Sequence, residues 1–123
     1  MNSEHTHDLE RELIEIQKEI RNEGDGYARY AIDAGQKRAA YDLAKAKQML
    51  QLLNFPEKRT VGEKEAMVDV AVEKELTDVR IAESLANASR ERLKALLAEL
   101  SAIQTRASLI KTERSLVGYG NGN

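Results

Sequence analysis

The chain has 123 residues, of which 41% are hydrophobic, 33% charged and only 4% aromatic, with one proline and a formal net charge of −2. A composition rich in Ala, Leu, Glu, Lys and Arg is typical of long helices, and it excludes a β-sandwich or barrel, which needs aromatic and β-branched strands. The absence of cysteine excludes disulfides and thiolate chemistry. We therefore expect an all-α protein.

The first expected helix runs from about Ser3 to Arg21. Its apolar residues recur at steps of four, three and four, which is the spacing of one helix face. They are Leu9, Leu13, Ile16 and Ile20. The glycines on either side of Asp25 favour a turn after this helix. Residues 1–26 are thus predicted to form an acidic helix and a glycine-rich turn.

A second helix is expected over about residues 27–53. Pro56 ends it, because proline disfavours helical geometry in the residue before it. Its apolar stripe has heptad-compatible spacing that is interrupted by Gln36. The stripe consists of Ile32, Ala39, Leu43, Ala46, Leu50 and Leu53.

A very long third helix is expected over about residues 61–115. Thr60 and Glu63 form a capping-box pattern at its start, and no proline or glycine follows Gly62 until Gly118. An apolar seam continues along it with three-four alternation and one charged interruption, Glu75. The seam is Val68, Val72, Val79, Ala82, Ala86, Ser89, Leu93, Leu96, Leu100, Ile103, Ala107 and Ile110.

This third helix would be ~80 Å long at 1.5 Å per residue. A compact domain of this size does not cover such a helix, so we expect coiled-coil-like packing in an oligomer. The oligomer contacts are assigned to Leu93, Leu96, Leu100 and Ile103. Residues 27–117 then form a helical hairpin core, and the Gly/Asn tail 118–123 is expected to be disordered because it has nothing to bury.

The charges are arranged in blocks of alternating sign. Residues 1–26 carry three basic and eight acidic side chains, residues 34–60 six and two, residues 61–89 three and seven, and residues 90–114 six and three. The net charges of these blocks are −5, +4, −4 and +3. The protein is therefore not basic overall, but it has two basic zones.

A basic and aromatic face is expected on the second helix, away from its apolar stripe. The face consists of Tyr30, Ala34, Lys37, Arg38, Tyr41 and Lys45. Cations interleaved with rings suit single-stranded nucleic acid, since cations neutralise phosphates and rings stack on bases. The alternative is a solvated face whose tyrosines pack against a neighbouring helix.

The sequence contains no catalytic constellation. His5 and His7 are two residues apart and do not share a helix face, the pair of Glu-x-x-His motifs that a di-iron site needs does not occur, and no phosphate-binding loop is present. We expect no enzyme activity, no cofactor and no metal. No apolar run approaches a membrane span, and the acidic N-terminus is unlike a signal peptide, so a cytoplasmic protein that does not bind membranes is expected.

Two stretches resemble the UvsY family of phage recombination mediators. Leu43-Ala44-Lys45-Ala46-Lys47 is similar to the family's basic Lys-Ala-Arg element, with Lys47 where the family has Arg. Residues 100–111, Leu-Ser-Ala-Ile-Gln-Thr-Arg-Ala-Ser-Leu-Ile-Lys, are similar to its C-terminal pattern Leu-x-Ala-Ile-x-x-Arg-x-x-x-Ile-Lys. The correspondence covers residues 25–113 loosely, and the acidic N-terminal helix has no clear counterpart.

The resemblance implies a ring-forming homo-oligomer that binds single-stranded DNA. Such proteins help to load a RecA-like recombinase, in DNA recombination, repair and replication, onto strands coated by a single-strand-binding protein. Lys45 and Lys47 would contact DNA, and Arg106, Ile110 and Lys111 would serve assembly. With the basic face, the predicted nucleic-acid-binding residues are Lys37, Arg38, Tyr41, Lys45 and Lys47. The alternative is a coiled-coil scaffold, chaperone or adaptor without nucleic-acid binding.

Overall fold

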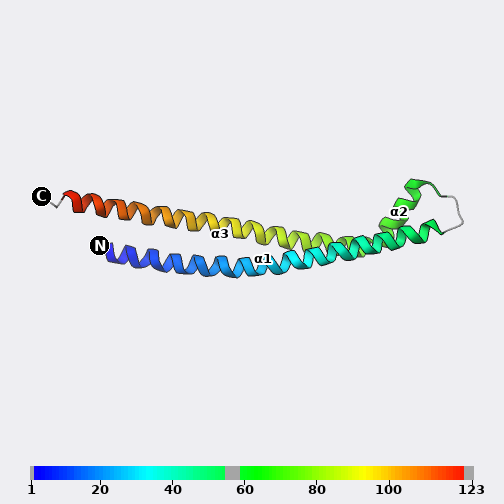
Figure 1. The fold of residues 1–123 in the computed structure, drawn as a ribbon, viewed down its shortest axis with the longest axis horizontal. Helices are drawn as coiled ribbons and strands as arrows, with labels where there is room; N and C mark the ends of the chain where they lie inside the picture. The colour runs from blue at the N-terminus through cyan, green and yellow to red at the C-terminus, as the bar shows by residue number, and fades with distance from the viewer. Residues whose placement is uncertain (1, 55–58, 121–123) are drawn as a thin grey trace. The chain divides into compact units, whose positions relative to one another are not determined.

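The computed structural model describes residues 2–54 and 59–120, with only the backbone described for residues 2–5 and 118–120. The described residues form three helices, α1 (Asn2–Leu53), α2 (Val61–Ala71) and α3 (Glu73–Gly120), and none of them lies in a strand (Figure 1). The prediction of an all-α protein with a long final helix is confirmed.

The chain divides into two compact units, and each takes one part of α1 and one part of α3. Unit 1 comprises Met1–Asp25 and Arg90–Asn123, and unit 2 comprises Gly26–Ser89, including all of α2. In each unit a segment of α1 lies antiparallel beside a segment of α3 (Figure 1). The core of each unit is the narrow layer between these two segments.

The predicted glycine-rich turn around Asp25 is wrong, because α1 continues through it as one helix. No described glycine has positive φ, and Gly24 and Gly26 have ordinary helical backbone. A glycine inside a helix costs about 0.5–1 kcal/mol relative to alanine. Nucleating a new helix costs more than propagating an existing one, and apolar residues on both sides hold the flanking turns in place. Two glycines therefore weaken α1 here without ending it.

Replacing Gly24 and Gly26 by alanine is expected to stabilise the protein by about 0.5–1 kcal/mol for each substitution. A Cβ added at either position would meet no atom within 4 Å, so the gain in helix propensity has no steric cost. Thermal unfolding followed by circular dichroism measures the effect, and the exposed Ala28→Gly serves as the reverse control. Destabilisation by Gly24→Ala and Gly26→Ala would show that the chain turns at this point.

The predicted helix 61–115 is interrupted at Val72, which adopts φ −110° and ψ 15° between α2 and α3. Three valines, Val68, Val70 and Val72, fall within five residues there, and β-branched side chains lower helix propensity. Val72 is 1% exposed, so its burial favours this local departure from helical geometry. The capping prediction is confirmed in part, because the Thr60 hydroxyl accepts a 3.1 Å hydrogen bond from the Glu63 N–H.

The ends of the long helices agree only partly with the predictions. α1 ends at Leu53 as expected, and residues 55–58, which include Pro56, lie outside the described residues. α3 continues to Gly120, so the predicted disordered tail is wrong for residues 118–120. Each residue added to an existing helix gains a backbone hydrogen bond without a new nucleation cost, which explains the extension. Residues 121–123 lie outside the described residues.

The seam predicted for the third helix is the face that α3 and α2 bury within their units. In unit 2, Val68, Val72, Val79, Ala82, Ala86 and Ser89 are all at most 9% exposed. In unit 1, Ile103 is 4% exposed, while Leu93, Leu96, Leu100 and Ile110 are half-buried. The stripe predicted for the first helix is confirmed opposite this part of the seam, with Ile16 buried and Leu9, Leu13 and Ile20 half-buried.

The expectation that another subunit covers this seam stays a prediction, although part of the seam packs against α1 of the same chain. In unit 1, Leu9 and Leu13 of α1 line the same small hollow as Ile103 and Ile110 of α3. The first predicted helix continues directly into the second, which brings α1 along α3 of the same chain. Part of the seam is thus buried within the chain, whereas Leu93, Leu96 and Leu100 are only half-buried.

The stripe predicted to be the core face of residues 27–53 is exposed, which is the largest correction to the sequence prediction. Ile32 is 62% exposed, Leu43 57%, Leu50 61% and Leu53 73%, and Ala39 and Ala46 are exposed too. The half-buried residues lie on the opposite side of α1 and are Tyr27, Asp33, Ala34, Tyr41, Ala44, Gln48 and Leu52. Both sides carry apolar residues, and the buried residues of α3 in this unit are small ones that favour close approach by the alanine-bearing side.

Glu75 is the charged interruption of the seam, and it is a local weakness of unit 2. Its Oε2 atom is buried with no hydrogen-bond partner among the described residues. Glu75→Leu is expected to raise the free energy of unfolding by about 1 kcal/mol, because it removes an unsatisfied buried oxygen and adds apolar contact. Urea unfolding measures this, with the exposed Glu73→Leu as the control. An unchanged or lower stability for Glu75→Leu would mean that the carboxylate has a stabilising role.

Candidate nucleic-acid interface

The structure brings together three of the five predicted nucleic-acid-binding residues. The ring of Tyr41 lies 5.7 Å from the Arg38 guanidinium carbon and 5.9 Å from the Lys45 Nζ atom, measured to the ring centroid. Both distances lie within the range of cation–π attraction, which is worth about 0.5–1 kcal/mol at exposed sites. We call Arg38, Tyr41 and Lys45 the basic–tyrosine cluster. Tyr41 is half-buried, and Arg38 and Lys45 keep their charged ends at the surface.

Arg38 also joins α1 to α3 within unit 2. Its Nη2 atom donates a 2.6 Å hydrogen bond to Glu83 Oε1, and the two side chains are 49% and 45% exposed. An ion pair this exposed contributes ~0–1 kcal/mol because water and salt screen it. Arg38 thus contacts both Glu83 and Tyr41, and the ion pair costs little to break.

The remaining lysines lie on different sides of α1. Lys37 is exposed and four residues before Tyr41, so it continues the row that Tyr41 and Lys45 form at successive turns. Lys47 is exposed but lies about 200° around the helix from Lys45, beside the exposed Leu43 and Leu50. Neither Lys37 nor Lys47 has an ion-pair partner among the described residues. Lys37 and Lys45 are therefore exposed residues on the side of α1 that bears the half-buried Tyr41 and lies toward α3, whereas Lys47 is on another side.

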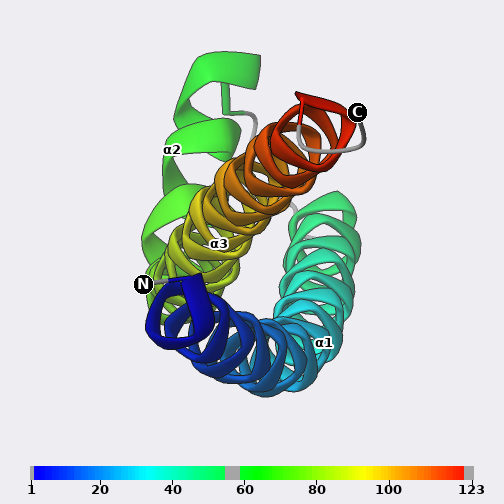
Figure 2. The same ribbon diagram turned by 90° about the vertical axis from the view of Figure 1, so that its left-hand side faces the viewer.

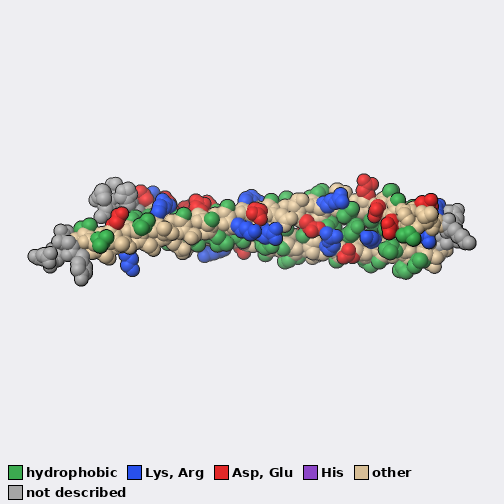
Figure 3. Space-filling view, turned by 90° about the horizontal axis from the view of Figure 1, so that it is seen from above, with side chains coloured by type: hydrophobic (Ala, Val, Ile, Leu, Met, Phe, Trp, Pro, Cys, Tyr) green, Lys and Arg blue, Asp and Glu red, His purple; other side chains and the backbone are tan. Residues whose placement is uncertain are grey.

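The alternating charge blocks are explained by the pairing of helices within each unit. In unit 2, the +4 block 34–60 lies in the same unit as the −4 block 61–89, and in unit 1 the −5 block 1–26 is joined by the +3 block 90–114. On the face drawn in Figure 3, basic and acidic side chains are interspersed. Any DNA contact must therefore be local, because neither unit is strongly basic.

The acidic N-terminal segment, which had no counterpart in the resemblance, is the partner of the C-terminal part of α3. Arg106 donates a hydrogen bond to Glu12, and Arg92 lies 3.5 Å from Glu23. Arg114 similarly donates to the hydroxyl of Thr6. Of the predicted assembly residues, Arg106 thus bonds to α1 of the same chain, and Ile103, Ile110 and Lys111 line a hollow together with residues of α1.

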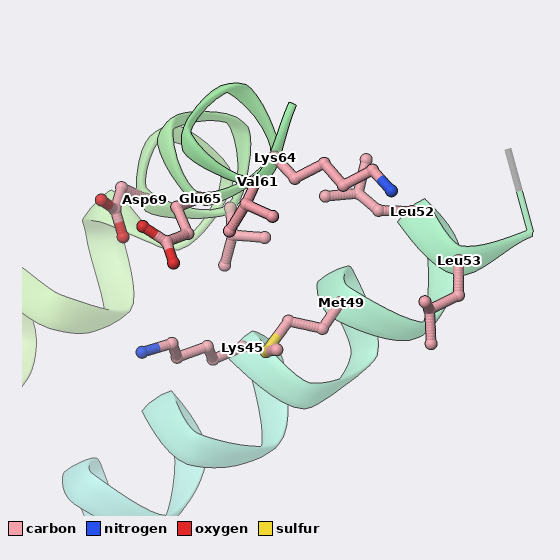
Figure 4. Close-up of a pocket in the computed structure, with 9 residues that line it drawn as sticks. Lys45, Met49, Leu52, Leu53, Val61, Lys64, Glu65 and Asp69 are labelled. Atoms are coloured by element: carbon pink, nitrogen blue, oxygen red, sulfur yellow. The ribbon is translucent and has the colours of Figure 1, made fainter. Parts of the chain in front are cut away.

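Sequence reasoning missed a groove of about 410 Å³ in unit 2, between the last turns of α1 and α2. Here α2 diverges from the end of α1 (Figures 1 and 2). The groove has an apolar floor that includes Met49, Leu52 and Val61, and Lys45 reaches along it from α1 (Figure 4). The carboxylates of Glu65 and Asp69 lie on the α2 side of the groove (Figure 4). The sequence carries no direct signal for this groove, and the closest indication is the run of Val68, Val70 and Val72 before the break between α2 and α3.

The described residues include no cluster of three or more His, Asp or Glu side chains able to hold a metal ion. Among the helices as described, none is long and apolar enough to cross a membrane. Comparison of the chain with family models, with curated proteins and with solved structures found no match. The function must therefore be argued from the surface features of the two units.

Proposed function

We propose that this chain is a DNA-binding protein and not an enzyme. It binds single-stranded DNA as a homo-oligomer in the bacterial cytoplasm and acts as a recombination mediator. In this role it helps to load a RecA-like recombinase onto strands coated by a single-strand-binding protein, in recombination, repair and replication. The basic–tyrosine cluster is the observation that carries the proposal, and the resemblance of residues 43–47 and 100–111 to the UvsY family adds the mediator role.

The cluster has the chemistry that single strands require. Two cations flank one ring within 6 Å, and Lys37 extends the row by one helical turn. Phosphates of an unpaired strand are spaced closely enough to contact successive cations, while an unstacked base stacks on the half-buried ring of Tyr41. A duplex keeps its bases stacked inside, so this row predicts a preference for single strands.

One subunit offers few cations, so the proposal requires several subunits on one strand. Each copy contributes Lys37, Arg38 and Lys45, with Lys47 on another side of α1. Linked sites raise the effective concentration of each further contact, and the overall affinity then exceeds that of any single site by about 10²–10⁴. An oligomer would therefore bind a long oligonucleotide far more tightly than a short one.

The mediator role is tested by recombinase loading. A single strand is coated with single-strand-binding protein, and the DNA-dependent ATPase of a RecA-like recombinase is followed with and without this protein. We expect the protein to shorten the lag before ATP hydrolysis reaches its steady rate, and Lys37→Glu with Lys45→Glu to restore the full lag. An unchanged lag, under conditions where the protein binds the same strand, would contradict the mediator role while leaving DNA binding intact.

A second candidate is a coiled-coil assembly protein without nucleic-acid binding. The exposed apolar stripe of α1 favours it, since contiguous exposed apolar residues mark interaction sites. The pairing of basic with acidic blocks inside each unit also fits a protein that does not bind nucleic acid. This candidate predicts self-association with no DNA binding even at low salt.

A further inference from the structure

We propose that the exposed stripe of α1 is a self-association face that pairs with the same stripe of a second copy, parallel and in register. The stripe is Ile32, Ala39, Leu43, Ala46, Leu50 and Leu53. This interface does not use the predicted assembly residues of α3, which lie in unit 1. It also does not depend on DNA binding.

The stripe has the pattern of a coiled-coil seam. Its residues alternate at steps of three and four from Ala39 to Leu53, and Ile32 and Gln36 extend the same pattern by one heptad. In heptad terms Gln36, Leu43 and Leu50 occupy a positions, and Ile32, Ala39, Ala46 and Leu53 occupy d positions. The four large side chains are 57–73% exposed, although α1 is packed on its other side. A seam of three heptads without a partner is unusual for a helix of a monomeric protein.

The charges beside the stripe identify its occupant as another copy of this chain. Asp42 lies directly before the a residue Leu43, so it occupies a g position. Lys47 lies directly after the d residue Ala46, so it occupies the e position five residues later. In a parallel coiled coil in register, residues with this relation on the two helices face each other, so Asp42 of each copy would pair with Lys47 of the other. Both are exposed and have no ion-pair partner among the described residues.

An antiparallel arrangement fits less well. In an antiparallel pair, g positions lie opposite g positions and e positions opposite e positions. The two Asp42 carboxylates, at g, would then share one edge of the interface, and the two Lys47 side chains, at e, would share the other. Like charges at such positions are destabilising. Gln36 supports the parallel register too, because one polar residue at an a position pairs best with itself across the interface.

Sedimentation equilibrium of the full chain without DNA tests the face. Leu43→Glu with Leu50→Glu is expected to raise the dissociation constant for self-association at least tenfold, because it buries carboxylates in the seam. The matched control is Ile81→Glu with Leu85→Glu on α3, whose side chains are 57% and 47% exposed and lie outside the stripe. A monomeric wild-type protein at micromolar concentration, or equal weakening by both variants, would overturn the proposal.

Two further variants test the orientation without placing charge in the seam. Asp42→Lys is expected to weaken association several-fold, and Asp42→Lys with Lys47→Asp to restore it. Because the native chain has no cysteine, Gln36→Cys should form an intermolecular disulfide on oxidation, whereas the exposed Gln104→Cys on α3 should not. Failure of the exchanged pair to restore association, together with no cross-link at position 36, would contradict parallel pairing.

Discussion

Ile16→Asp is expected to destabilise the protein by roughly 3–5 kcal/mol, a large part of the ~5–15 kcal/mol that holds a domain together. Ile16 is 3% exposed in unit 1, so the substitution removes a buried side chain and leaves an unpaired carboxylate in its place. Circular dichroism during urea unfolding measures the loss. We expect part of the helical signal to be lost already at low urea concentration.

Ile14 provides a closely matched control two residues away on the same helix. It is 63% exposed, and Ile14→Asp makes the same chemical change at the surface. Its effect is expected to stay within about 0.5 kcal/mol. Equal effects of the two substitutions would mean that α1 does not present this face to α3.

Lys37→Glu with Lys45→Glu is expected to reduce affinity for single-stranded DNA by about 100-fold at 50 mM salt. Both lysines are exposed, and they lie one helical turn before and after Tyr41. Each lost phosphate contact reduces the slope of log affinity against log salt by about 0.7 for single strands, and the new carboxylates repel the backbone. Fluorescence anisotropy of a labelled oligonucleotide gives both quantities.

The control for this variant is Lys18→Glu with Lys94→Glu in unit 1. It changes the net charge by the same amount at exposed positions far along the sequence from the basic–tyrosine cluster. We expect it to reduce affinity by less than about fivefold, since long-range repulsion is screened at this salt concentration. A loss as large as that of the Lys37 and Lys45 variant would show that DNA responds only to net charge.

Periodicity predicted the buried seam of α3 well, because one face of that helix is apolar and the other is charged. Every residue of the three-four alternation from Val68 to Ile110 is buried or half-buried, except Ala107. The first stripe of α1 was predicted for the same reason. In both cases the three-four alternation is continuous on one face, although exposed apolar residues such as Ile14, Ile81 and Leu97 lie outside it.

The remaining part of α1 has two apolar faces, and periodicity cannot choose between them. The larger residues, such as Leu43 and Leu50, suggested a core, but the face bearing Ala34, Tyr41 and Ala44 lies toward α3. The choice depends on the partner helix, where Glu83 meets Arg38. The sequence prediction missed the continuity of α1 through Gly24 and Gly26. Glycine lowers helix propensity only slightly, and the cooperative extension of an existing helix outweighs this effect.

Of the candidate site, the residue types were predictable and their grouping was not. The sequence indicated Arg38, Tyr41 and Lys45 as neighbours on one helix face, and the structure places the ring between the two cations. The ion pair with Glu83 and the groove beside α2 depend on contacts between distant segments. Lys47 was grouped with Lys45 by resemblance, although a separation of two residues turns the side chains to different sides of a helix.

Binding of the wild-type protein to single-stranded and duplex oligonucleotides of the same sequence, measured by anisotropy from about 50 to 200 mM salt, tests the central claim most directly. We expect a clear preference for the single strand and an affinity that falls steeply with salt, as phosphate neutralisation by several subunits requires. No binding at the lowest salt, or equal binding to the duplex, would contradict the proposal. The coiled-coil assembly protein would then be the better description of this chain.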